Sequence, residues 1–196
     1  GDLLGLSGVR AYANLNLGRL HLERGDPDEA ERAEARALTI GMSERSPRVI
    51  GAARVHLGTI ALYRGDPALA EAEALAAIDL LSVAPPLQAG AFAVLARALS
   101  AQGRAEEARG PAEQALRMVD SGQHDIFDAL VRVAYVEAMI QAGETELAKR
   151  AIESAVRSLG GRAARIEAGP KRMAFLERVS LHARTFELAR QLGTIE

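Results

Sequence analysis

The hydrophobic positions of this chain recur three or four residues apart along most of its length. This spacing places apolar side chains on one face of an α-helix. No stretch alternates apolar and polar residues in the way that predicts a strand. The pattern therefore predicts an all-α protein. The apolar positions that show the helical spacing most clearly are Leu17 and Leu20, Leu57 and Ile60, Leu95 and Leu99, and Tyr135 and Met139.

Glycine separates these helical runs at regular intervals. Residues 25, 65, 103 and 143 are glycine, at spacings of 40, 38 and 40, and alanine follows at positions 30, 70, 108 and 148. A second run at helical spacing follows each glycine, so each unit is predicted to be helix, tight turn, helix. Asp26 and Pro27, like Asp66 and Pro67, are suited to the start of the second helix. The repeat predicts four helix pairs, at residues 8–45, 46–84, 85–122 and 123–160, within a single domain of residues 1–196.

The end of the chain differs from these four pairs. Residues 160–169 are predicted to form a loop, and Pro170 is expected to begin a C-terminal helix over residues 170–192. That helix has apolar residues with no partner helix in the sequence. It is therefore expected either to cap the fourth pair or to join a second copy of the chain, as a monomer or a homodimer through the C-terminal helix.

Small residues at fixed places in the units resemble those of tetratricopeptide (TPR) repeats. Gly18, Gly58 and Ala96 occupy equivalent places in first helices, and alanine recurs at 37, 77, 115 and 155 in second helices. A small residue lets neighbouring helices approach closely. The resemblance, to arrays with long repeats of about 40 residues, implies a right-handed superhelical array of antiparallel helix pairs. Such a TPR-like α-solenoid would have about nine helices here, with the first helices lining a concave groove.

The tail carries a second resemblance. The segment FLERVSLHARTFELARQLG, residues 175–193, is similar to one that closes the TPR region of bacterial serine/threonine kinase–ATPase–TPR signalling proteins. In those proteins proline usually follows the Arg-Val pair, whereas this chain has Ser180, so the helix is expected to run on. The resemblance implies a non-catalytic regulatory module of a larger bacterial signalling or transcriptional regulator.

Composition narrows the choice of partner. The chain has 48% hydrophobic residues and a formal net charge of −2, so no overall charge attracts it to nucleic acid or membrane. It has no cysteine, which excludes disulfides and thiolate chemistry. No apolar run reaches the length of about 20 residues that a membrane helix needs. These features predict a cytoplasmic protein without a membrane partner.

The sequence contains no set of residues with catalytic or metal-binding spacing. The four histidines, His21, His56, His124 and His182, stand singly, with no second metal ligand at helical spacing. No glycine-rich phosphate loop follows a strand. The expectation is therefore no enzyme, no metal and no cofactor.

Two groups of residues are candidates for binding a partner. The register of the TPR resemblance places ten of them in the groove, where they would bind a peptide or protein segment with apolar anchors. Five basic residues near the loop form a possible contact site for phosphate, RNA or an acidic surface, although no aromatic residues alternate with them to stack on bases. The alternatives are thus a peptide- or nucleic-acid-sensing receptor, or a self-associating scaffold. The groove residues are Tyr12, Asn16, Arg19, Glu23, His56, Thr59, Tyr63, Arg97, Glu137 and Gln141, and the basic residues are Arg157, Arg162, Arg165, Lys171 and Arg172.

Overall fold

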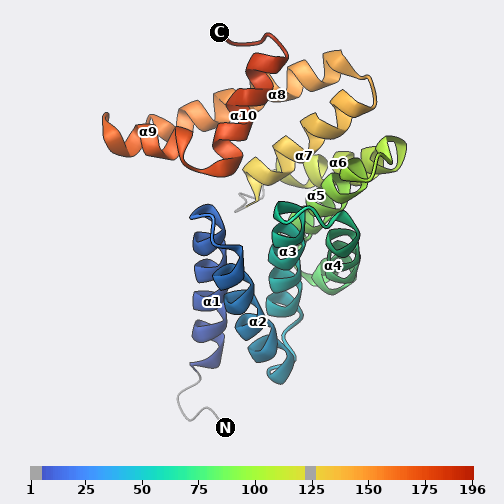
Figure 1. Cartoon of the computed structure of the whole chain (residues 1–196), viewed down its shortest axis with the longest axis vertical. Helices are drawn as coiled ribbons and strands as arrows, with labels where there is room; N and C mark the ends of the chain where they lie inside the picture. Colours follow the sequence, from blue (N-terminus) through green and yellow to red (C-terminus); the bar gives the residue numbers. More distant parts are fainter. Residues whose placement is uncertain (1–5, 122–126) are drawn as a thin grey trace.

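The computed structural model describes residues 6–121 and 127–196, and in these ranges its regular structure is entirely helical, as predicted. Helices follow one another as antiparallel pairs along a curved array (Figure 1). The pairs are α1 (Ser7–Glu23) with α2 (Pro27–Ser43), α3 (Pro47–Tyr63) with α4 (Pro67–Leu80), α5 (Pro85–Ala101) with α6 (Ala105–Asp120), and α7 (Asp128–Gln141) with α8 (Thr145–Ala163). The 3₁₀ turn η1 (Leu81–Val83) follows α4, and α9 (Pro170–Glu177) and α10 (Ser180–Gln191) follow α8.

The turn within each pair depends on glycine. Gly25, Gly65, Gly103 and Gly143 have φ angles of 77°, 77°, 75° and 76°, in the left-handed region that other residues enter only at a cost. In the first two pairs an aspartate then caps the second helix. The Asp26 carboxylate accepts a hydrogen bond from the Glu29 N–H at 3.1 Å, and Asp66 does the same for the next pair. The repeated Arg-Gly-Asp-Pro sequence is therefore a turn and a helix cap.

Small residues bring the helices into close contact. The alanine that follows each turn glycine, at positions 30, 70, 108 and 148, is completely buried. A Cβ atom added to Gly58 of α3 would lie only 3.3 Å from the Ala70 carbonyl oxygen of α4. Each later first helix also packs against both helices of the preceding pair. The buried residues form a small cluster at the first junction and a large one through the later pairs, and the partly buried Leu87 packs against both.

A buried carboxyl group lies at the contact of the first two pairs. Glu34 of α2 is completely buried beneath Gly18, where any larger residue would overlap its carboxylate. His56 Nδ1 lies 2.8 Å from Glu34 Oε1, a hydrogen bond that joins α2 to α3, while Glu34 Oε2 has no partner in the described part of the chain. Burial raises the pKa of the Glu34 carboxyl, and the bond to His56 opposes this rise without cancelling it.

The C-terminal part corrects two predictions. Residues 160–163 belong to α8 and not to a loop, because Leu159 and Ala163 bury their side chains and hold the helix together across Gly160 and Gly161. The predicted helix over residues 170–192 is two helices, separated at Val179, whose backbone is extended. The described chain therefore has ten α-helices where about nine were expected.

The last helix caps the array. α10 packs against α7 and α8, in the way that α7 packs against α5 and α6. It does so through Leu188 and Ala189, which are buried, and through Leu181 and Leu192 beside them. The apolar side of α10 is thus used within the chain, which is the capping arrangement of the two that were expected. The predicted boundary between the third and fourth pairs, at residues 122 and 123, and His124 lie outside the described residues.

Gly65 and Gly160 allow a matched test of the turn. Replacing Gly65 by alanine should lower the free energy of unfolding by roughly 1 kcal/mol, because alanine is strained at a positive φ although no atom crowds its Cβ. The same change at Gly160, inside α8 with open space around its Cβ, should raise stability by about 0.5–1 kcal/mol. Urea unfolding measures whether each change lowers or raises the free energy of unfolding. Equal effects of the two changes would contradict the role of the turn.

Glu34→Gln tests the raised pKa of the buried carboxyl. A carboxyl whose pKa is raised on folding supports stability below its unfolded pKa, and that support is lost as pH rises through the folded pKa. The variant should therefore gain stability relative to the parent at neutral pH, on the order of 1 kcal/mol, and less at acidic pH. Urea unfolding at pH 4 and pH 7.5 measures the difference. Glu153→Gln, at an exposed position of α8, should show none, and a loss at neutral pH in Glu34→Gln would indicate a favourable charged pair.

Candidate functional site

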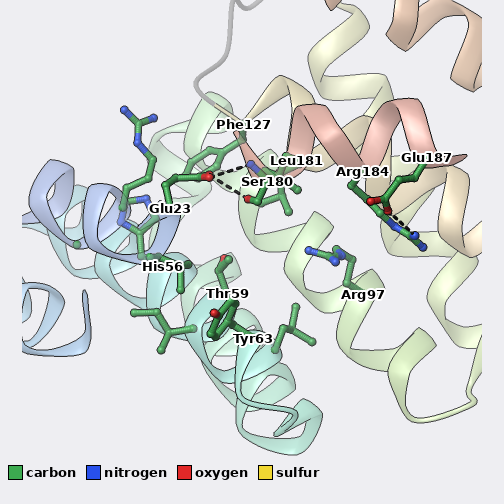
Figure 2. Close-up of a pocket in the computed structure, with 16 residues that line it drawn as sticks. Glu23, His56, Thr59, Tyr63, Arg97, Phe127, Ser180, Leu181, Arg184 and Glu187 are labelled. Carbon is green, nitrogen blue, oxygen red and sulfur yellow. Dashed lines mark hydrogen bonds and ion pairs between the residues drawn. The ribbon is translucent and has the colours of Figure 1, made fainter. Parts of the chain in front are cut away.

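A cavity of about 370 Å³ lies between the first helices of the pairs and the last helix (Figure 2). Its volume falls in the range of pockets that hold ligands or peptide side chains. Five segments of the chain meet around it, because the curvature of the array brings α10 back toward α1 and α3. The lining residues are Gly18, Arg19, Leu22 and Glu23 of α1, His56, Thr59, Ile60, Leu62 and Tyr63 of α3, Arg97 of α5, Phe127 and Leu130 beside and in α7, and Ser180, Leu181, Arg184 and Glu187 of α10.

The structure brings together most of the predicted groove residues but not all of them. Tyr12 and Asn16 are exposed on α1 and line no described hollow, since they lie nearer the N-terminus of the helix face that carries Arg19 and Glu23 to the cavity. Glu137 and Gln141 line a second hollow of about 380 Å³ that shares Arg97 and Arg184 with the first. The predicted residues that line the main cavity are Arg19, Glu23, His56, Thr59, Tyr63 and Arg97.

Apolar side chains form much of the cavity wall. Ile60 is almost completely buried, and Leu22, Leu62 and Leu181 are half-buried around it. Tyr63 also lines the cavity and keeps 58% of its surface exposed. An aromatic side chain in this position offers a large contact area at small entropic cost to an incoming apolar group.

One carboxylate positions two arginines at the cavity. Glu137 accepts hydrogen bonds from the Nε atoms of Arg97 at 3.0 Å and of Arg184 at 2.9 Å. The two terminal nitrogens of Arg97 have no hydrogen-bond partner among the described residues. Burial opposes the charge of Arg184, but its bonds to Glu137 and Glu187 outweigh this and raise its pKa. Arg97 therefore has two oriented donors available for an acidic group.

A second carboxylate joins the first helix to the last. Glu23 Oε2 accepts the backbone N–H of Ser180 at 2.9 Å, and Oε1 accepts its hydroxyl at 3.1 Å, across 157 residues of sequence (Figure 2). The carboxylate satisfies an N–H at the start of α10, where the helix dipole also favours negative charge. This contact closes one end of the space between the first helices.

His56 contributes to the wall between α1 and α7. Its ring meets the ring of Phe127 edge to face, with the ring centres 5.8 Å apart. Its Nδ1 is held by Glu34, and its Nε2 is buried without a hydrogen-bond partner in the described part of the chain. The ring is thus fixed in place from both sides.

The five predicted basic residues do not form one loop. Arg157 and Arg162 lie on α8, Arg165 lies in the connection, and Lys171 and Arg172 lie on α9. Two of them have structural roles. Arg172 donates to the Ile166 carbonyl oxygen, with its Nε at 2.9 Å, and the Arg162 guanidinium lies 5.6 Å from the centre of the Phe175 ring. These positions correct the expectation of a single loop, and contact of these residues with a partner stays a prediction.

Sequence reasoning missed the residues that α10 supplies. Ser180, Leu181, Arg184 and Glu187 reach the cavity only because α10 folds back onto α7 and α8. The local signal that could have located the helix start is Ser180 itself, where the resembling sequences have proline, since both residues are common at helix N-termini.

The part of the chain that the structure describes shows neither a metal cluster nor a membrane-spanning helix. Within residues 6–121 and 127–196, no group of three or more histidine, aspartate and glutamate side chains is arranged to hold a metal ion. No helix in these ranges has both the length and the apolar character to cross a membrane.

Comparisons with known proteins identify the type of repeat. Models described as tetratricopeptide repeat match residues 11–33, in the first pair, and 89–119, in the third. The chain is similar to the nearly identical TPR-like repeats of a kinesin light chain-like protein from Podosopora anserina, with 17% identity, a TM-score of 0.58 and 94% of each chain covered. A single-substitution variant of that protein has the same identity and TM-score, with 94% of this chain and 93% of the other covered. No curated protein sequence matches the chain.

At 17% identity, the likeness to solved structures establishes the fold. None of these comparisons supports the resemblance of residues 175–193 to kinase–ATPase–TPR proteins. The two repeat matches begin at Ala11 and Ala89, which are equivalent positions in the first helices of their pairs. The chain therefore has a TPR-like α-solenoid fold, and two of its segments match the tetratricopeptide repeat family.

Proposed function

We propose that the chain is a non-catalytic protein-interaction module that binds a peptide segment in the cavity between its first helices. The observation that carries this proposal is an apolar cavity with an arginine that offers two unpaired donors at its edge. TPR repeats in general mediate protein–protein interaction, and TPR-like folds are typically non-catalytic. The partner segment would place an apolar side chain among Leu22, Ile60 and Leu181 and an acidic group near Arg97.

The charges around the cavity favour a short acidic–apolar motif over a highly acidic peptide. Arg97 and Arg184 already share Glu137, and Glu23 is occupied by Ser180, so the net positive charge available to a ligand is small. One carboxylate on the ligand could bind the free nitrogens of Arg97 without displacing Glu137. A second carboxylate nearby would face Glu187, which lines the same cavity.

The structure offers less support for a nucleic-acid receptor. Arg162 and Arg172 are engaged within the chain, and the five basic residues are divided between two helices and their connection. A regulatory role within a larger bacterial signalling or transcriptional regulator extends the proposal, and its support is the resemblance of residues 175–193. Recovery of the parent sequence with a kinase or ATPase domain would test that extension.

Tyr63→Ala should weaken peptide binding about tenfold or more, because Tyr63 supplies exposed aromatic surface at the cavity. The probe is a peptide of 12 residues selected from a displayed random library on the immobilised chain. Fluorescence anisotropy then measures its Kd for the parent and the variant. Replacing the acidic residue of the selected peptide by its amide should also weaken binding, and this loss should shrink in Arg97→Lys, which cannot offer two parallel donors.

Tyr12→Ala is the matched control for this measurement. Tyr12 has 48% of its surface exposed, close to the 58% of Tyr63, but it lies outside the cavity. Its replacement should leave the Kd of the selected peptide unchanged. Equal losses in the two tyrosine variants, or selected peptides whose binding is unaffected by Tyr63→Ala, would contradict binding in the cavity.

A further inference from the structure

One side of α1, opposite to the cavity, has an uncovered apolar stripe. Val9, Leu17 and Leu20 have 66%, 44% and 44% of their surfaces exposed, and the exposed Ala13 lies between them at helical spacing. Single exposed apolar residues are ordinary on a protein surface, whereas four on one side of a helix form a contiguous patch.

The internal repeat shows what covers this side in the later pairs. In α3, 40 positions further along the chain, the equivalents of Val9, Ala13 and Leu20 are Val49, Ala53 and Ile60, with 4%, 0% and 2% of their surfaces exposed. Val49 and Ala53 are buried because α3 packs against both helices of the first pair, whereas Ile60 also lines the cavity and Leu57, the equivalent of Leu17, is half-buried. The equivalent residues that are likewise buried in and beside α5 and α7 are Ala91, Leu95, Ala98, Phe127, Val131, Tyr135 and Ala138.

The second helix of the preceding pair makes part of this cover directly. Gly41 of α2 faces Val49 so closely that a Cβ added to Gly41 would lie 2.9 Å from Val49 Cγ1. α4 and α6 hold the same place against α5 and α7. The stripe on α1 thus corresponds to a surface that packs against the preceding second helix in α3, α5 and α7.

A polar contact accompanies this packing at the ends of α3 and α5. Arg64, after α3, donates to Glu31 of α2 at 2.8 Å, and Gln102, after α5, donates to Glu71 of α4 at 2.7 Å. The two acceptors are themselves equivalent, 40 residues apart. Arg24 occupies the matching position after α1, where it is exposed and has no side-chain hydrogen bond or ion pair among the described residues.

We propose that this side of α1 docks the second helix of another helix–turn–helix unit of the same repeat type. The docked helix would present small residues to Val9, Ala13 and Leu17, and an acidic residue to Arg24 at the position that Glu31 holds in α2. The interface would continue the array outward from α1, and it is separate from the cavity of the proposed function.

A second copy of the chain does not fit this surface. Each second helix of the chain, α2, α4, α6 and α8, is already covered by the helix that follows it, α3, α5, α7 or α10. Two α1 helices placed against each other on this side would bring Arg10 and Arg24 together, since α1 has no acidic residue before Glu23. The occupant is therefore a helix with an uncovered apolar face and an acidic residue, from a unit outside the described structure.

A duplicated pair provides the probe for this surface. Residues 7–46 are repeated directly ahead of Ser7 in the full chain, which keeps the 40-residue spacing and places a second copy of α2 next to α1. Hydrogen exchange of the α1 amides should slow by about tenfold or more relative to the unextended chain, and the melting temperature should rise. Unchanged exchange in α1 would overturn the proposal.

Charge reversal identifies the contact at Arg24. In the extended chain, Arg24→Glu at the original position should remove part of the gain in melting temperature. Adding Glu31→Arg in the duplicated copy, with the original Glu31 unchanged, should restore that gain. Leu17→Glu should abolish the slowed exchange. Leu75→Glu on α4, with 50% of its surface exposed, is the matched control and should not. Failure of the charge pair to compensate would contradict the predicted acidic partner.

Sedimentation of the unextended chain at micromolar concentration tests the alternative occupant, a second copy of the chain. The proposal predicts a monomer that Leu17→Glu does not change. A dimer that dissociates in Leu17→Glu would make a second copy the occupant and overturn the proposal. A failure of these tests leaves the peptide measurement with Tyr63→Ala unaffected, because Leu17 and Arg24 do not line the cavity.

Discussion

The close approach of neighbouring helices at small residues is the constraint on which this structure depends. Ala30, Ala70, Ala108 and Ala148 are completely buried, and Gly18 and Gly58 leave no room for a larger side chain. With so little side-chain volume between the backbones, van der Waals contact must be continuous to stabilise each junction. The same spacing forces the chain to reverse within a few residues, which is why glycine with a positive φ recurs at each turn.

Curvature of the array converts a groove into a cavity. Regular stacking alone would leave the first helices lining an open surface. In this chain α10 returns across that surface, and Glu23 fixes its first turn to α1 through two hydrogen bonds. Glu137 holds Arg184 of α10 beside Arg97 in the same way. A ligand would therefore meet a limited pocket with defined polar ends, which favours recognition of one anchoring side chain over a long extended peptide.

The parts of the fold that depend on neighbours in sequence could be predicted. The turn at Gly25 and the cap at Asp26 are local, and the repeat transfers them to later pairs. The break at Val179 has only the local signal of Ser180, because the carboxylate that caps α10 comes from Glu23, 157 residues away. The repeat register placed Tyr63 and other first-helix residues at the cavity, whereas Tyr12, nearer the start of α1, does not line it. Residues from α10 belong to no repeat, so no register could assign them.

The cavity and the exposed apolar stripe of α1 meet on the last turns of this helix. Leu17, Leu20 and Arg24 face away from the array, while Gly18, Arg19 and Glu23 line the cavity. α1 packs against α2 and α3 and bonds to α10 through Glu23, whereas the other first helices pack between helices on both sides, so the end of α1 is the least supported wall of the cavity. A helix docked on the outer side would restrain the same turns that carry Glu23, and so would stabilise its contact with Ser180. Docking at the end of the array and binding in the cavity would then be linked through the rigidity of one helix, with no change of shape needed between them.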